Sequence, residues 1–413
     1  MRAATSSTPS NRTERFSLPP CRRQAYGIVW KALDKRTKQV VAVKKIFDAF
    51  QNSTDAQRTF REITFLQQLA SHQNIVKLLN VFKADNDRDI YLIFEFMDTD
   101  LHHVIRAGIL QDIHQRYVMY QLFRCLKYLH SASILHRDIK PSNLLVNSGC
   151  LLKVADFGLA RSMTHGIDEP ITAPMLTDYV ATRWYRAPEI LLGSTEYNFG
   201  VDMWSCGCIL GELLSGKPIF PGTSTMNQLE KVLGLTGRPC REDIESVKSP
   251  FAATMLGSLP PLKPQLLEEV FPNASGEALD LLKGLLQFNP EKRFTAAMAL
   301  KHPYLAMFHN PSDEPTSPSE ITTPIDGFIR YSVAQYRDKL YTTILQKKKE
   351  VRAQVRENRA SKFQSNSFGG DHFGKPNSQY EQNSDASISE TDSVASDSTF
   401  AEQTHGLIAA VRL

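Results

Sequence analysis

The sequence predicts an α+β protein with two lobes, a small strand-rich lobe at residues 25–97 and a larger helical lobe at 98–305. Residues 40–43 form a β-branched run typical of a buried strand, and residues 90–97 are a second apolar stretch of this kind. Between them, Thr-Asp-Ala-Gln at 54–57 predicts the capped start of a helix. With 413 residues, 42% of them hydrophobic, the chain is long enough to build both cores.

The composition argues against several classes of protein. The net charge of +4 is too small to favour nucleic-acid binding, and no apolar run approaches the ~18 residues of a membrane span. The first residues lack the apolar segment of a secretory signal. The six cysteines show no CxxC or paired-metal spacing, which indicates reduced thiols of an intracellular protein. We therefore expect a cytoplasmic protein without a nucleic-acid partner or membrane span, and we expect a monomer.

Two short motifs carry the strongest chemical signal. Residues 136–143 read His-Arg-Asp-Ile-Lys-Pro-Ser-Asn, and Asp-Phe-Gly follows at 156–158. Phosphoryl transfer requires a carboxylate beside the attacking hydroxyl and oxygen ligands for Mg²⁺. Asp138 and Asn143 are close enough for one loop to supply a base and a metal ligand. The 13 residues from Asn143 to Asp156 suit a short hairpin that returns a second metal ligand to the same point.

A lysine and a glutamate near the start of the chain extend this pattern. Lys44 follows the strand at 40–43 directly, and burying its ammonium is costly unless anions surround it. Glu62 lies among the core positions of the predicted helix. With Ala-Pro-Glu at 187–189 and Arg293, the motifs occur in an order that resembles the protein kinases.

The resemblance implies the bilobal protein kinase fold and a serine/threonine kinase that uses ATP and Mg²⁺. Asp138 would be the catalytic base, and Lys140 would neutralise the γ-phosphate. Asn143 and Asp156 would bind Mg²⁺. Lys44, paired with Glu62, would position the α- and β-phosphates. The other residues implied for the nucleotide site are Gly27, Val29, Ala42, Phe94 (behind adenine), Glu95 and Met97 (whose backbone would hold adenine), Asp100 (near the ribose) and Leu145.

The segment before the Ala-Pro-Glu motif narrows the resemblance. Residues 177–189 read Thr-Asp-Tyr-Val-Ala-Thr-Arg-Trp-Tyr-Arg-Ala-Pro-Glu, which is very similar to the mitogen-activated protein kinases. The central Asp and the long preceding segment resemble the atypical extracellular-signal-regulated branch, which activates itself. The resemblance implies activating phosphorylation, by the kinase itself, at Thr177 and Tyr179. It also implies that Arg183 and Arg186 shape a pocket for Ser/Thr-Pro sites of protein substrates.

The sequence departs from the family at the loop that covers the phosphates. Kinases place Gly-x-Gly-x-x-Gly there because glycine lets the backbone approach the oxygens. Only the third glycine, Gly27, is present, and Arg22 and Gln24 occupy the other two positions. Residues 1–24 show almost no strand pattern, so we expect an irregular segment without the family's first strand. Two interpretations stay open: an alternative or misassembled start on an intact kinase, or a truly weakened nucleotide site. We favour ATP binding with reduced affinity over a nucleotide-poor pseudokinase scaffold.

Residues 306–358 are predicted to extend the kinase domain. Asp313 and Glu314 match the acidic docking patch that holds basic peptides of partner proteins in these kinases, although an ordinary acidic turn has the same pattern. Residues 337–358 have a helical pattern with seven basic and three acidic residues. These fit a solvated helix face, or a nuclear-import patch that would take the protein into the nucleus as well. Residues 359–413 predict a disordered tail, rich in Ser and Asn and poor in aliphatics.

Overall fold

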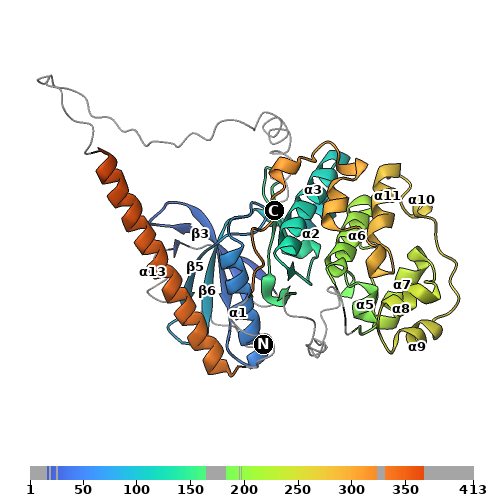
Figure 1. Cartoon of the computed structure of the whole chain (residues 1–413), viewed down its shortest axis with the longest axis horizontal. Helices are drawn as coiled ribbons and strands as arrows, with labels where there is room; N and C mark the ends of the chain where they lie inside the picture. Colours follow the sequence, from blue (N-terminus) through green and yellow to red (C-terminus); the bar gives the residue numbers. More distant parts are fainter. Residues whose placement is uncertain are drawn as a thin grey trace, which may run out of the picture.

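The computed structural model has two lobes, a β-sheet lobe and a helical lobe, as the sequence predicts (Figure 1). The residues that it describes are 16–17, 20–24, 27–163, 183–194, 196, 198–322 and 331–366.

An antiparallel sheet of six strands forms the small lobe, in the order β1-β3-β4-β6-β5, with β2 also paired to β3. In β4, Val41, Val43 and Ile46 are buried, whereas β6 is buried from Ile90 to Phe94 because both of its faces are covered. The strands are β1 (Phe16–Ser17), β2 (Pro20–Gln24), β3 (Gly27–Asp34), β4 (Val40–Ile46), β5 (Leu78–Lys83) and β6 (Ile90–Glu95).

Strands β1 and β2 correct one expectation from the sequence. Residues 1–24 were expected to be irregular, yet Arg23 pairs with Ile28 and Gln24 pairs with Gly27 across β2 and β3. The prediction is wrong for these two strands because a ladder is made by main-chain groups. The neighbouring β3 supplies those partners, so a tertiary contact overrides weak β-propensity. Residues 1–15 lie outside the described part.

Helix α1 (Ser53–Gln68) packs its apolar side into the core of the small lobe. Phe60, Ile63 and Leu66 are all buried. The helix begins earlier than the predicted capping box, because the side chain of Asn52 accepts a hydrogen bond from the N–H of Asp55. Asparagine is among the strongest N-caps, so this cap prevails over the expected one at Thr54.

The large lobe is built around two long helices, α3 (Asp112–Ser131) and α6 (Gly200–Ser215). Helix α6 is buried on all sides from Gly200 to Leu213, as expected for a predominantly apolar helix, although it includes the buried acids Asp202 and Glu212. At Gly207 a Cβ would lie 2.7 Å from Leu286 Cδ2, so glycine permits the close approach of the chain at Leu286. The other helices of this lobe are α2 (Leu101–Ala107), α5 (Pro188–Leu191), α7 (Thr225–Thr236), α8 (Arg241–Ser246), α9 (Ala252–Gly257), α10 (Leu267–Val270), α11 (Gly276–Leu285) and α12 (Ala296–Leu300).

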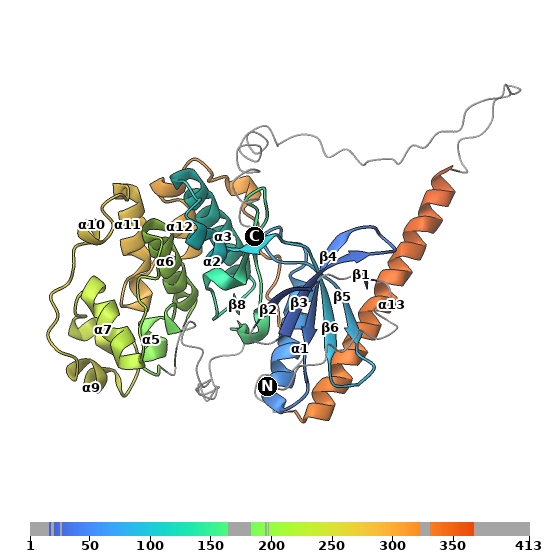
Figure 2. The ribbon, with the colours of Figure 1, turned by 180° about the vertical axis from the view of Figure 1, so that it is seen from behind.

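Helix α13 (Val333–Asn366) returns to the small lobe and lies along it in both ribbon views (Figures 1 and 2). Tyr336 packs against Phe60 of α1 with ring centroids 6.2 Å apart. The helix predicted at 337–358 is therefore confirmed. Residues 359–366 were expected to be disordered, and this part is wrong. Extending an existing helix adds one hydrogen bond for each residue fixed, without a new nucleation cost.

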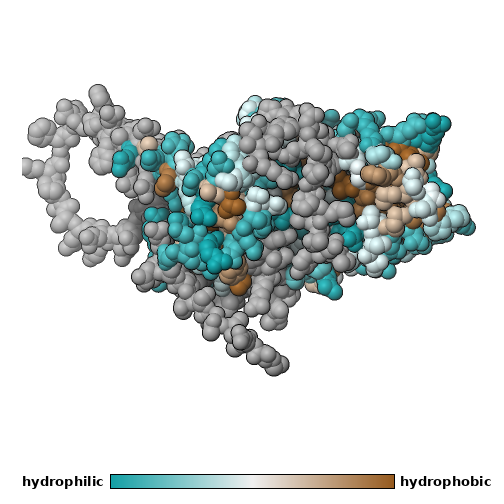
Figure 3. Space-filling model, turned by 90° about the horizontal axis from the view of Figure 1, so that it is seen from below, coloured by the Kyte–Doolittle hydropathy of each residue, from teal (hydrophilic) through white to brown (hydrophobic). Residues whose placement is uncertain are grey.

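Within the described residues, no helix combines the length and the apolar character needed to cross a lipid bilayer. Figure 3 shows an apolar area on the helical lobe, at the end of the molecule away from α13. The exposed apolar side chains of this lobe include Phe251 and Leu266.

Candidate active site

The predicted metal ligands are brought together by a hairpin between the lobes. Strands β9 (Leu144–Val146) and β10 (Leu152–Val154) pair antiparallel, with Leu144 opposite Val154. Asn143 comes directly before β9, and Asp156 follows two residues after β10. The short return inferred from their spacing is thereby confirmed, and both residues lie at one end of the hairpin.

Asp138 is at the centre of a compact hydrogen-bonded group. Lys140 Nζ donates to Asp138 Oδ2 at 2.7 Å, and Asn143 Nδ2 donates to the same oxygen at 3.0 Å and to the Asp138 carbonyl at 2.9 Å. Burial raises the pKa of Asp138, and the charge of Lys140 opposes this effect. The three residues are thus held in one loop with their polar ends converging.

Asp202 of α6 holds the loop that carries Asp138 in place. Its carboxylate accepts the N–H groups of His136 and Arg137, both at 2.9 Å, and is completely buried. Arg137 has a φ of 70°, a left-handed conformation that is unfavourable for a residue with a side chain. The two hydrogen bonds stabilise this conformation, which sets the direction of the chain into Asp138.

Asp156 and Asn143 suit a hard divalent cation. Asn143 uses its amide nitrogen on Asp138, so the oxygen is the group left to face a metal. Although burial on its own would raise it, the charges of Lys44 and Lys140 lower the pKa of Asp156. Its carboxylate is therefore an anion. An anionic carboxylate and an amide oxygen side by side are the donors that Mg²⁺ prefers.

Lys44 and Glu62 form the predicted ion pair across β4 and α1. The amine lies 2.7 Å from Glu62 Oε1, and both side chains are nearly buried. Burial alone would lower the pKa of Lys44, but Glu62 and then Asp156 raise it above its usual value. Lys44 is therefore a cation. Its charge acts on Asp156, as does the charge of Lys140 in the catalytic loop.

Most of the predicted nucleotide-binding residues lie on strands β3, β4, β6 and β9, close to Lys44. Val29 pairs with Lys44 and Ala42 pairs with Phe94, while Leu145 lies opposite Asp100. Gly27 begins β3, and the partly buried Met97 lies in the connection between the lobes. Asp100 caps α2 by accepting the N–H of His103 at 3.1 Å. The N–H of Glu95 donates to Lys77 O at 3.1 Å. The carbonyl of Glu95 is therefore the main-chain group of this residue that can accept a hydrogen bond from adenine.

Only part of the predicted substrate region is described. Thr177 and Tyr179 lie outside the described residues. Arg183 donates from Nη1 to Thr223 O at 3.3 Å, and the partly buried Arg186 follows three residues later.

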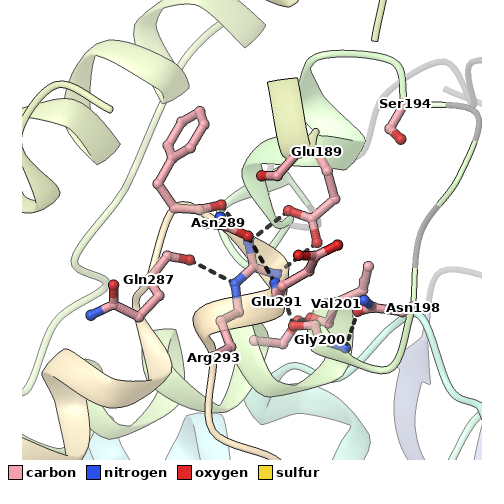
Figure 4. A network of polar contacts seen from close by, with 12 residues as sticks. Glu189, Ser194, Asn198, Gly200, Val201, Gln287, Asn289, Glu291 and Arg293 are labelled. Carbon is pink, nitrogen blue, oxygen red and sulfur yellow. Dashed lines mark hydrogen bonds and ion pairs between the residues drawn. The ribbon is translucent and has the colours of Figure 1, made fainter. Parts of the chain in front are cut away.

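A buried ion pair fixes the chain just after this region (Figure 4). The two guanidinium nitrogens of Arg293 donate to the two carboxylate oxygens of Glu189 at 2.6 and 2.7 Å, and both side chains are essentially inaccessible. Arg293 also donates to the carbonyls of Gln287, Phe288 and Gly200. The pair thus ties the Ala-Pro-Glu motif to a residue 104 positions later in the chain.

The two acids of the expected docking patch differ in their surroundings. Asp313 is exposed and pairs with Arg124 at 2.7 Å. Glu314 is buried, and its carboxylate accepts from Lys127, from His309 Nδ1 and from the N–H of Asn310. A docking role would need an accessible carboxylate, whereas local donors draw that of Glu314 inward and bury it.

Sequence reasoning missed a buried polar cluster beside the interlobe connection. Asn74 is fully buried and donates to Gln121 Oε1 and to Leu152 O. Lys153 is buried between two apolar residues of β10. The one available signal was Lys153, a charged residue at the centre of a buried strand. The polar residues that lie on helices gave no signal, because in a sequence such residues are normally assigned to the surface.

Comparison with known proteins agrees with this geometry. The family described as "Protein kinase domain" matches residues 24–305. This chain belongs to the protein kinase family. The kinase is 66% identical over 328 residues to "Extracellular signal-regulated kinase 2" of Dictyostelium discoideum, covering 79% of this chain and 89% of that protein. It is 55% identical over 347 residues to "Mitogen-activated protein kinase 15" of Xenopus laevis, covering 84% of this chain and 59% of the relative.

A third relative is "Extracellular signal-regulated kinase 7" of Drosophila melanogaster, 49% identical over 324 residues, with 78% of this chain and 35% of that protein covered. The chain thus spans just over half of the frog protein and about a third of the fly protein. These relatives place the kinase among the mitogen-activated protein kinases, in the atypical extracellular-signal-regulated branch, as the sequence predicts. Members of this family are serine/threonine kinases that act on proteins, and this is the enzyme class of the chain.

Proposed function

We propose that this kinase transfers the γ-phosphate of ATP to Ser/Thr-Pro sites of proteins, with Asp138 as the base. The observation that carries the proposal is the convergence of Lys140 and Asn143 on the Asp138 carboxylate. A carboxylate held in this way can accept the proton of a substrate hydroxyl, and burial raises its pKa toward that of a useful base.

The other residues supply charge and position. Lys140, held against Asp138, stabilises negative charge on the phosphoryl group being transferred. Lys44, oriented by Glu62, holds the α- and β-phosphates. Asn143 and Asp156 would hold Mg²⁺, which supplies charge neutralisation between the β- and γ-phosphates when bound. The Glu95 carbonyl and the Met97 backbone would hold adenine.

The rival function is a nucleotide-poor pseudokinase scaffold that acts through the docking residues and the C-terminal tail. The Lys44–Glu62 pair and the Asp138 group favour the enzyme, because a scaffold needs neither arrangement. A thermal-shift titration with MgATP separates the two, since a ligand that binds the folded form raises its stability. A melting temperature that stays constant up to millimolar MgATP would favour the scaffold.

Preference for proline after the phosphoacceptor follows from the chemistry of the substrate pocket. Arg183 already occupies the Thr223 carbonyl, and a substrate N–H placed there would lose that acceptor. An unsatisfied donor costs about 1–3 kcal/mol, or roughly ten- to a hundredfold in selection. Proline has no N–H, so Ser/Thr-Pro peptides should be preferred by that margin. A positional-scanning peptide array tests this, and enrichment of arginine before the acceptor without proline after it would contradict it.

Self-activation is the regulatory part of the proposal. The similarity to relatives of the atypical branch supports it. Protein made in bacteria, with no other eukaryotic kinase present, should carry phosphate on Thr177 and Tyr179. Mass spectrometry of wild type and of Asp138→Ala gives the test, because only the active protein should be modified. Bare sites in wild type after incubation with MgATP would require an upstream kinase instead.

A further inference from the structure

The ammonium of Lys153 is held between segments of the chain that are distant in sequence. Lys153 lies at the centre of β10 and is only 4% exposed. Its Nζ donates to the backbone oxygen of Gln73 at 2.6 Å and lies 3.0 Å from Glu95 Oε1. A buried ammonium is costly without such partners, so both contacts contribute to keeping it in place.

The partners of Lys153 are themselves fixed. Glu95 Oε1 also accepts the N–H of Lys77 at 2.7 Å. The chain at 74–76 is tied to β10 by two main-chain bonds, from Val154 N to Asn74 O at 2.8 Å and from Val76 N to Val154 O at 3.1 Å. The loop after α1, the end of β6 and strand β10 therefore meet around one charge.

Arg124 of α3 holds the same loop from the other side. Its Nη1 donates to Gln73 Oε1 at 2.7 Å and to Asn74 Oδ1 at 3.2 Å. The Gln73 carbonyl that receives Lys153 is thus anchored to the large lobe. The interlobe connection at Glu95 is linked through Lys153 to a fixed point.

Each segment that meets at Lys153 carries or adjoins a part of the proposed nucleotide site. The loop at Gln73 follows helix α1, which bears Glu62; the end of β6 bears Glu95; and β10 is followed by Asp156. We propose that Lys153 is a positioning residue for the nucleotide, which fixes the Glu95 backbone relative to the phosphate and metal residues. This inference rests on the proposed function, in which the Glu95 carbonyl holds adenine.

Stability alone does not explain a charged pair at this place. A methionine would fill a similar volume beside Leu152 and Val154, and replacing a buried ion pair by apolar groups is often neutral. Glu95 keeps part of its surface in solvent, so it can lose the lysine without becoming a fully buried lone charge. A positioning role therefore predicts a loss of nucleotide affinity that exceeds any loss of folding stability.

The test is isothermal titration calorimetry with MgADP on the full chain. Lys153→Met should weaken binding by about three- to tenfold, as expected for partial loss of a charge-assisted hydrogen bond. Glu95→Gln keeps the shape and an acceptor but removes the charge, and should weaken binding to a smaller extent. Both substitutions break the same contact, the one between Lys153 and Glu95. The double variant should therefore bind MgADP little worse than Lys153→Met.

Lys248→Met provides the matched control, since Lys248 pairs with Glu196 on the exposed surface of the helical lobe. It should bind MgADP like wild type. With a substrate protein, Lys153→Met should raise the KM for ATP by the same factor while kcat at saturating ATP changes far less. Equal MgADP affinity in wild type and in both single variants would overturn the inference alone. Failure of wild type itself to bind MgADP would overturn the proposed function, and the inference with it.

Discussion

Lys44 Nζ lies 2.7 Å from Glu62 Oε1, so an ion pair joins strand β4 to helix α1 inside the small lobe. Because α1 also packs against α13 through Phe60 and Tyr336, the position of Glu62 depends on a helix far away in the sequence as well as on β4. Through this pair, the packing of the small lobe determines the position of Lys44 in the proposed phosphate site.

Removal of Glu62 should impair catalysis more than folding. In Glu62→Ala the lysine loses its oriented partner, and a hydrogen bond between charged groups contributes about 1.5–3 kcal/mol, so kcat/KM should fall about 10- to 100-fold. Steady-state kinetics with a protein substrate measures this. Thr54→Ala, an exposed position on the same helix, is the control. Unchanged kcat/KM in Glu62→Ala would show that the pair does not serve the phosphates.

The Glu189–Arg293 pair should be a major determinant of stability. In Arg293→Met the Glu189 carboxylate stays buried without its partner, which costs about 3–5 kcal/mol of unfolding free energy. Urea denaturation followed by fluorescence gives the value. The exposed pair of Arg241 with Glu245 offers a matched control, and Arg241→Met should leave the midpoint unchanged. Similar midpoints for the two variants would contradict the structural role.

The pH dependence of stability should contain a contribution from His72. Burial, and then the charges of Arg124 and Lys153, lower the pKa of His72 to about 3. In the unfolded chain the value is about 6.5, so below this pH the unfolded state binds the proton that the folded state refuses. The folded protein therefore loses stability as pH falls from about 6.5 towards 3, by about 1.4 kcal/mol at about pH 5.5.

His72→Gln removes this titration and keeps an acceptor for the Asn74 N–H that His72 Nδ1 accepts at 3.1 Å. Urea unfolding of both proteins at neutral pH and at about pH 5.5 should show a larger loss for wild type. Equal losses would mean that His72 titrates normally in the folded protein.

Restoring glycine in strand β2 should improve ATP binding. Gln24 faces Gly27 across the β2–β3 ladder, where the family has a glycine hairpin over the phosphates. Arg22→Gly with Gln24→Gly should lower the KM for ATP, since glycine lets the backbone approach the oxygens. Arg23→Gly, between the two positions, controls for the general weakening of a strand by glycine. A double variant no better than this control would exclude the hairpin from the phosphate site.

Much of the active site could be predicted because its chemistry fixes residue type and spacing. Asp138, Asn143 and Asp156 were predicted from one loop and one hairpin, and the hairpin is present. Strand β2 could not be predicted because its partner β3, rather than its own composition, determines the pairing. The burial of Glu314 was also missed, since its donors Lys127 and His309 come together only in the folded chain.

Lys153 shows a further limit of the sequence. A lysine in a short apolar strand indicates that something holds it, but its partners Gln73 and Glu95 lie 80 and 58 residues earlier. Contacts of this kind follow from the way the two lobes are packed together, which local periodicity does not encode.

Transfer of radiolabelled phosphate from MgATP to a generic basic substrate protein, by wild type and by Asp138→Ala, tests the proposal that Asp138 is the base most directly. Wild type should label the substrate, and the variant should be slower by about 10²–10⁴-fold because general base catalysis contributes that much. A thermal shift with MgATP should show that the variant still folds and still binds nucleotide. Equal incorporation by the two proteins would contradict the assignment of Asp138 as the base.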